Sequence, residues 1–270
     1  MPADDPGRCV PVAGNPGAAE PGMDKAGKAG GQIVPVLMYH NIAATPAGLR
    51  SYRSLYVSPA RFARQMWLLQ QLGYAGLSMS AALPYLRGER RGRVVAITLD
   101  DGYVDNLDAA LPVLQSFGFS ATIYMVSGSI GRFNTWDAER LGIRKPLMSA
   151  ADMRRWNDAG MEIGAHTRSH PRLSQCTDAV LHGEIHGCKA DLEDRLGCAV
   201  TQFCYPYGDL DERVVAVARE AGYAAATTTR RGRAVAGADL WRLPRIQVAR
   251  HHLLPQFAAR VLTRYKDRRA

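Results

Sequence analysis

The chain has 270 residues, of which 47% are hydrophobic and 22% are charged, and its formal net charge is +9. This composition is typical of a globular protein with a sizeable core, so it excludes a wholly disordered chain. The basic residues are scattered and form neither a recognition helix nor a basic stripe interleaved with aromatic residues, so we expect no nucleic-acid partner.

Residues 1–31 are rich in Pro, Gly and Ala, and we expect a disordered tail there, followed by one domain over 32–270. The tail has no apolar core that would act as a signal peptide. No segment approaches the roughly 20 apolar residues that a transmembrane helix needs. The five cysteines include no Cys-x-x-Cys pair, which argues against a disulfide framework and against a cysteine zinc site. We therefore expect reduced thiols and a cytoplasmic or loosely membrane-associated protein.

Short apolar runs alternate with helical patterns along the domain. Strands are expected at 33–39, 94–99, 121–126, 161–165, 199–205, 224–228 and 245–249. Helices are expected at 60–72, 106–117, 149–159, 174–196, 210–221 and 254–265, and irregular loops at 141–146 and 230–239. Because strands that alternate with helices pair in parallel, the pattern predicts an α/β fold. About seven units suit a distorted (β/α) barrel, with its site at the C-terminal strand ends.

Polar residues follow several of these strands. Asp100 and Asp101 follow the buried strand at 94–99, and two adjacent carboxylates there are costly to desolvate unless something compensates their charge. His166 follows the strand at 161–165. His166 and His170 are four residues apart, a spacing that lets both imidazoles face one metal ion. Together these residues indicate a metal hydrolase site.

A second histidine pair, His182 and His186, has the same spacing. Here Glu184 is misplaced for the helical zinc-protease motif, in which Glu directly follows the first His. The pair also lies in a charge-rich helix rather than after a strand. We interpret it as a polar helix face.

Three short motifs resemble those of the polysaccharide deacetylases, the NodB-homology or carbohydrate esterase 4 family. Thr-Leu-Asp-Asp-Gly at 98–102 is similar to the first motif, usually Thr-Phe-Asp-Asp-Gly. His-Thr-Arg-Ser-His at 166–170 is similar to the second, and Tyr-Pro-Tyr-Gly at 205–208 to the third. Their order and spacing agree with the family. The similarity covers roughly 33–250, with the motif-bearing core at about 93–270.

The resemblance implies a metal-dependent hydrolase that removes N-acetyl groups from an amino-sugar glycan or glycan precursor and releases acetate. It assigns Asp101, His166 and His170 as ligands of one divalent metal ion, commonly Zn²⁺, with Co²⁺, Ni²⁺ or Mn²⁺ as alternatives. It assigns Asp100 as the base for the metal-bound water and the backbone N–H of Tyr207 as a donor to the oxyanion. This division is chemically sound, because three N/O ligands leave a coordination position open for water.

The chain departs from the family pattern in the third motif, which usually begins with an arginine that pairs with the base. Cys204 occupies that position. Either another arginine supplies the charge or Asp100 is tuned differently. The run Trp-Arg-Leu-Pro-Arg-Ile at 241–246 offers Arg242 and Arg245, and we favour Arg245 because it lies at a predicted strand start.

The usual late Leu-x-His motif, which supplies the general acid, has no good match. His40, at the end of the first predicted strand, resembles the histidine that fills this role in the circularly permuted branch. That branch includes the poly-N-acetylglucosamine deacetylases of biofilm systems. We assign the acid to His40, with His251 as the alternative.

The expected partner is an acetylated amino-sugar substrate, bound by Tyr205, Pro206 and Trp241, the last closing the acetyl pocket. The sugar's identity and the oligomeric state stay open. So do two other functions: a carbohydrate-binding pseudoenzyme, which the missing arginine favours, and a deacylase of a small non-polymeric amide or ester. The basic surface is suited to phosphate-bearing, lipid-linked or nucleotide-linked sugars.

Overall fold

A computed structural model of the chain describes residues 31–49 and 51–264. The predicted disordered tail lies outside the described residues apart from Gly31, as do residues 265–270, so the boundaries of the predicted domain stay a prediction. Within the described ranges no helix has the length and apolar character needed to cross a bilayer. Cys176, Cys188 and Cys204 are free thiols, whereas Cys198 is disulfide-bonded. The expectation of reduced thiols is therefore wrong for Cys198, because an odd cysteine count still leaves room for a single pair.

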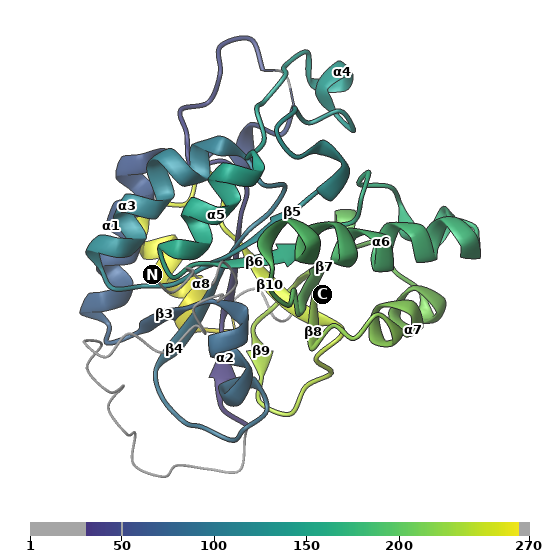
Figure 1. Cartoon of the computed structure of the whole chain (residues 1–270). Helices are drawn as coiled ribbons and strands as arrows, with labels where there is room; N and C mark the ends of the chain where they lie inside the picture. Colours follow the sequence, from purple (N-terminus) through teal and green to yellow (C-terminus); the bar gives the residue numbers. More distant parts are fainter. Residues whose placement is uncertain (1–30, 50, 265–270) are drawn as a thin grey trace, which may run out of the picture.

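Parallel strands close into a barrel, which confirms the predicted fold class (Figure 1). Around the ring they are β2 (Val36–Tyr39), β4 (Val94–Leu99), β5 (Thr122–Met125), β6 (Glu162–Ala165), β7 (Gln202–Cys204), β8 (Ala225–Arg231) and β10 (Leu243–Gln247), with β10 pairing back onto β2. A further strand, β3 (Ala75–Leu77), pairs with the first half of β4. Two short strands, β1 (Ile33–Val34) and β9 (Ala234–Val235), form a separate antiparallel pair.

Helices surround the barrel and connect its strands. They are α1 (Pro59–Gln71), α2 (Met79–Leu86), α3 (Leu111–Ser116), α4 (Ala138–Leu141), α5 (Ala150–Asp158), α6 (Asp178–Leu196), α7 (Glu212–Glu220) and α8 (Leu254–Leu262). Figure 1 shows α1, α3 and α5 on one side of the barrel and α6 and α7 on the other. Side-chain caps fix several helix starts; for example, Ser149 and Asp152 form a capping box at α5.

Every residue of β4 is buried, and successive residues face two different apolar clusters. Val95, Ile97 and Leu99 pack in the cluster that contains the buried face of α1. Val94 and Ala96 pack instead with residues from opposite strands of the ring and with α2. This alternation is the period of two that a strand requires. The second set therefore fills the barrel interior, and α2 packs against it.

Several predicted elements differ in detail from the observed ones. The helix predicted at 106–117 begins as a π-helical turn, Asn106–Ala110, before α3. The loop predicted at 230–239 contains the end of β8 and all of β9, so that prediction is wrong. Both β3 and α2 lie in a stretch for which we predicted no element. In α2 most side chains are buried, so the helix lacks the polar face by which a sequence pattern is recognised.

Candidate metal centre and active site

The residues expected to carry the chemistry gather at the carboxyl end of the barrel. His40 follows β2, the two aspartates follow β4, and His166 follows β6. The backbone of this rim is fixed by the strand ladder: the Asp100 N–H donates to the Tyr39 carbonyl and the His166 N–H to the Met125 carbonyl. Barrel closure therefore brings together side chains that are far apart in the sequence.

Asp101, His166 and His170 form a buried group with the character of a metal site. The Nε2 atoms of His166 and His170 each lie 3.5 Å from Oδ1 of Asp101. One ligand atom from each residue lies within 4.8 Å of the other two. Tetrahedral bonds of roughly 2.0–2.1 Å would separate neighbouring ligand atoms by roughly 3.4 Å, which exceeds an ordinary hydrogen bond. The three side chains therefore fit a shared divalent ion.

Surrounding groups orient these ligands. Nδ1 of His166 donates to the Cys204 carbonyl oxygen at 2.7 Å, which leaves Nε2 facing Asp101. Burial and the neighbouring His166 charge lower the pKa of His170 to about 3, so this imidazole is neutral at physiological pH, the form that binds a metal. Asp101 and His170 also have positive φ angles of 76° and 62°. Such angles are uncommon outside glycine and concentrate at functional sites.

The loop between the two histidines is anchored by a residue that the sequence patterns did not single out for this role. Glu184 of α6 accepts hydrogen bonds from the backbone N–H of Arg168 at 2.8 Å and of Ser169 at 2.9 Å. It also accepts one from the Ser169 hydroxyl at 2.5 Å. The carboxylate between His182 and His186 therefore holds the His166–His170 loop in place.

Asp100 is paired with Arg245, which extends from β10 into the barrel. The pair is bidentate, with Nη1 2.7 Å from Oδ1 and Nη2 2.8 Å from Oδ2. The guanidinium also donates from Nε to the Thr228 carbonyl at 2.8 Å, and its Nη2 lies 3.2 Å from Sγ of Cys204. Burial alone would raise the pKa of Asp100, but the Arg245 and His40 charges hold it below its usual value. The positive charge that Cys204 cannot provide thus comes from β10.

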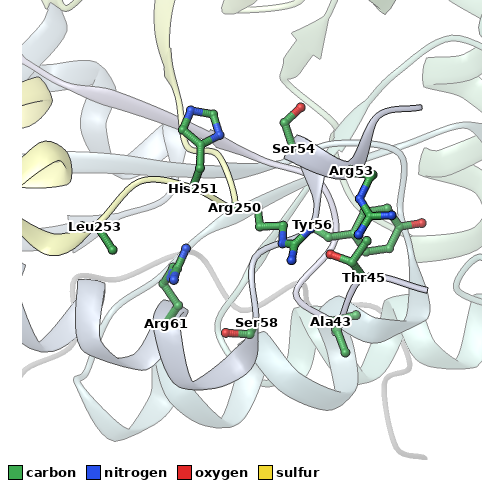
Figure 2. A pocket seen from close by; sticks show the side chains of 11 residues that line it. Ala43, Thr45, Arg53, Ser54, Tyr56, Ser58, Arg61, Arg250, His251 and Leu253 are labelled. Atoms are coloured by element: carbon green, nitrogen blue, oxygen red, sulfur yellow. The ribbon is translucent and has the colours of Figure 1, made fainter. Parts of the chain in front are cut away.

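His40 and Tyr207 lie at the open side of the site. Nε2 of His40 is 3.9 Å from Oδ2 of Asp100, and the His40 side chain is 16% exposed. Tyr207 has a φ angle of 60° in the turn after β7, and its ring packs edge-on against His170 with centroids 4.6 Å apart. Pro206 precedes it and is buried. The alternative acid, His251, is exposed and lines a separate cavity (Figure 2).

Two residues expected to bind substrate lie elsewhere, and those predictions are wrong for their side chains. Tyr205 is fully buried and packs edge-on against Phe203 in the layer between barrel and helices. Trp241 precedes the amino end of β10, opposite the site, and lies under the guanidinium of Arg219. Arg242, the other candidate partner for Asp100, instead pairs with Asp239 and Glu212 at the surface. The motif positions alone did not show which way these side chains point.

Trp136, which no motif marked, contacts the candidate metal site. It lies in the connection between β5 and β6 and stacks on His170, with ring centroids 4.8 Å apart and planes 23° apart. Next to it, burial and the Asp101 charge raise the pKa of Asp137 to about 6. The only sequence signal for Trp136 is an aromatic residue in a loop after a strand.

The second histidine pair lies apart from this centre. The rings of His182 and His186 stack on α6 at 5.1 Å, and a carboxylate oxygen of Glu220 lies near enough to join a metal-binding group. His182 and Glu220 are exposed. None of the three residues follows a barrel strand, so they do not belong to the site at the carboxyl end.

A (β/α) barrel with a buried aspartate and two histidines beside an aspartate–arginine pair is the arrangement of a carbohydrate deacetylase. Residues 87–226 match the family model described as polysaccharide deacetylase. The chain is 30% identical over 218 residues to YxkH of Bacillus subtilis, which is assigned by name to the polysaccharide deacetylases; the match covers 80% of this chain and 71% of that protein. The chain belongs to the polysaccharide deacetylase family.

Solved structures agree with this assignment. BC0361, a polysaccharide deacetylase from Bacillus cereus, is 29% identical with a TM-score of 0.73, over 86% of this chain and 69% of that one. IcaB from Ammonifex degensii shares the fold, with 23% identity and a TM-score of 0.72 over 87% of this chain and 98% of that one. Family membership supports deacetylation of a polysaccharide.

Proposed function

We propose that this protein removes N-acetyl groups from an amino-sugar glycan or glycan precursor and releases acetate. The observation that carries the proposal is the buried group of Asp101, His166 and His170 beside the paired carboxylate of Asp100. The names of the relatives, which are polysaccharide deacetylases, support the same substrate class.

The cofactor in this proposal is one divalent metal ion held by Asp101, His166 and His170. The mixed carboxylate and imidazole ligand set suits Zn²⁺, with Co²⁺, Ni²⁺ and Mn²⁺ as alternatives. When bound, such an ion lowers the pKa of a water molecule and polarises the acyl oxygen. The convergence of three buried ligand atoms supports this cofactor.

The protein's own groups have separate roles in the proposed reaction. Asp100, kept ionised and oriented by Arg245, accepts a proton from the attacking water. The backbone N–H of Tyr207, in the turn after β7 that Pro206 begins, donates to the oxyanion that forms on the amide carbon. His40, 3.9 Å from Asp100, donates a proton to the leaving amine.

A pseudoenzyme is less well supported than the sequence suggested. Its support was the missing arginine of the third motif, where Cys204 stands. The bidentate contact from Arg245 supplies the charge next to Asp100 from another strand. The base therefore has the partner that ionisation in a buried site requires.

The test is acetate release from an N-acetylglucosamine tetramer, with and without a chelator. Asp100→Asn and His40→Ala should each lower kcat by roughly 10²- to 10⁴-fold, because each removes a proton-transfer group. Both variants should keep the metal content of the wild type. His182→Ala, which changes an exposed histidine on α6, is the control and should keep full activity. Full activity in His40→Ala would rule out the proposed acid, and activity that a chelator leaves unchanged would contradict the metal centre.

A further inference from the structure

A cavity lined by basic residues lies after the ends of β2 and β10, at the same end of the barrel as the active site. Its lining side chains are shown in Figure 2. Its volume is about 700 Å³, and its wall is built from the segments after β2 and β10 and from the start of α1. Arg53, Arg61, Arg250 and His251 line it, and no carboxylate does. In Figure 2, Arg61 rises from α1, whereas Arg250 and His251 come from the loop after β10. The cavity therefore has a strongly positive potential.

The charge of these arginines is not neutralised within the described residues. The Arg53 guanidinium donates to the Leu49 carbonyl at 3.1 Å, which leaves its charge uncompensated. No ion pair joins Arg61 or Arg250 to a carboxylate in the part of the chain that the structure describes. Three guanidinium groups around one cavity repel one another unless an anion lies among them.

The cavity adjoins a smaller one. This neighbour, of about 260 Å³, shares Ser54 and His251 with the larger cavity and is also lined by Arg231 and Arg245, again without a carboxylate. The cavities lie next to the ends of β2 and β10, at the same end of the barrel as His40, which follows β2.

We propose that this cavity binds a phosphate or pyrophosphate group carried by the acetylated sugar substrate. The proposal rests on the deacetylase function and specifies its substrate class. Each guanidinium group presents a planar pair of N–H donors that matches two phosphate oxygens. A phosphate group can bind several of these arginines at once, whereas a carboxylate needs only one of them. Ser58, the N-cap of α1, also lines the cavity, and its side chain makes no capping hydrogen bond. Its hydroxyl and the positive end of the helix therefore add to the attraction for an anion.

The experiment compares an N-acetylglucosamine tetramer with the same tetramer carrying a 1-diphosphate, esterified either to a nucleoside or to a short prenyl alcohol. We expect kcat/KM to be at least about tenfold higher for one or both phosphorylated tetramers, mainly through KM. The ester that gives the larger gain in kcat/KM shows whether the natural sugar is linked to a nucleoside or to a lipid alcohol. Inorganic phosphate should compete with the phosphorylated tetramer more strongly than with the neutral one.

In the double variant Arg61→Ala/Arg250→Ala, the ratio of kcat/KM for phosphorylated over neutral tetramer should fall to near one. The control is Arg90→Ala/Arg91→Ala, which removes the same charge from two exposed arginines that precede β4, at the opposite end of the barrel. This control should keep the wild-type ratio.

Equal kcat/KM for the phosphorylated and neutral tetramers in the wild type would overturn the proposal, as would the same loss of ratio in both double variants. If a tetramer that ends in a uronic acid showed the same gain in kcat/KM over the neutral tetramer, the phosphate assignment would be overturned. Acetate release from the neutral tetramer is measured in the same assay. If no tetramer releases acetate, the deacetylase function itself fails, and the two failures are thus distinguished.

Discussion

At the scale of single residues, Arg245 determines the state of the proposed base. Its side chain is fully buried and makes two short contacts with Asp100. A buried carboxylate without a partner would be protonated, because burial favours its neutral form. The Arg245 charge reverses this tendency, so Asp100 is ionised and able to accept a proton.

Removing the Arg245 charge should shift the acid limb of the kcat–pH profile to higher pH. In Arg245→Ala the pKa of Asp100 rises, so the base becomes protonated at a higher pH and kcat falls at pH values where the wild type is active. Arg245→Lys keeps the charge but loses the bidentate contact, so the acid limb of its kcat–pH profile should shift less. We expect Arg245→Ala to lower the free energy of unfolding by about 3–5 kcal/mol, because it leaves a buried charge unpaired.

The measurement is kcat between about pH 4 and 9, with unfolding by denaturant in parallel. Arg242→Ala is the control, since Arg242 lies three residues away in the sequence but pairs at the surface. Its profile should coincide with the wild type. Coincident profiles for Arg245→Ala and the wild type would show that Arg245 does not tune Asp100.

At the scale of elements, α6 supports the proposed metal site from outside the barrel. The helix carries Glu184, whose carboxylate accepts two backbone N–H groups from the loop between His166 and His170. Without it, these buried donors would lack a partner and the loop would relax. The ligand geometry of β6 therefore depends on a helix that follows it in the chain.

Glu184→Ala should weaken metal affinity by roughly 10- to 100-fold, as is usual when a group that orients metal ligands is lost. Metal titration of the purified variant measures this directly. Asp194→Ala, which removes an exposed carboxylate from the same helix, serves as the matched variant and should bind metal like the wild type. An unchanged affinity in Glu184→Ala would mean that the loop holds its shape by itself.

At the scale of the whole molecule, the proposed metal ion links segments that the barrel brings together. Asp101 follows β4, and the two histidines follow β6, two strands further around the ring. A ligand that binds only the folded state stabilises it by mass action. Metal binding is therefore expected to stabilise the fold as well as the site.

Thermal unfolding with and without a chelator tests this coupling. At a metal concentration of roughly 1,000 times Kd, the stabilisation is about 4 kcal/mol, or roughly 10 °C in Tm for a chain of this size. The double variant His166→Ala/His170→Ala should lose both the stoichiometric metal and the difference in Tm. Equal Tm values in the wild type with and without chelator would contradict the metal centre.

The local pattern of elements could be predicted because it depends on neighbours in the sequence. The strand at 94–99 was predicted at its observed bounds, since its apolar run is buried on both faces. The candidate metal ligands could also be selected from the sequence, because their motifs lie directly after strands. By contrast, α2 was missed because it is buried against the barrel interior and shows no polar face.

The sequence by itself determined most of the order of strands and helices, the family and the candidate ligands Asp101, His166 and His170. The tertiary structure decided which arginine serves Asp100, since Arg245 lies 145 residues further along the chain and contacts it only through barrel closure. It also directed Tyr205 and Trp241 away from the site and gathered arginines from α1 and from the loop after β10 around one cavity. Local patterns record which residues are buried, whereas contacts between distant strands depend on how the sheet closes.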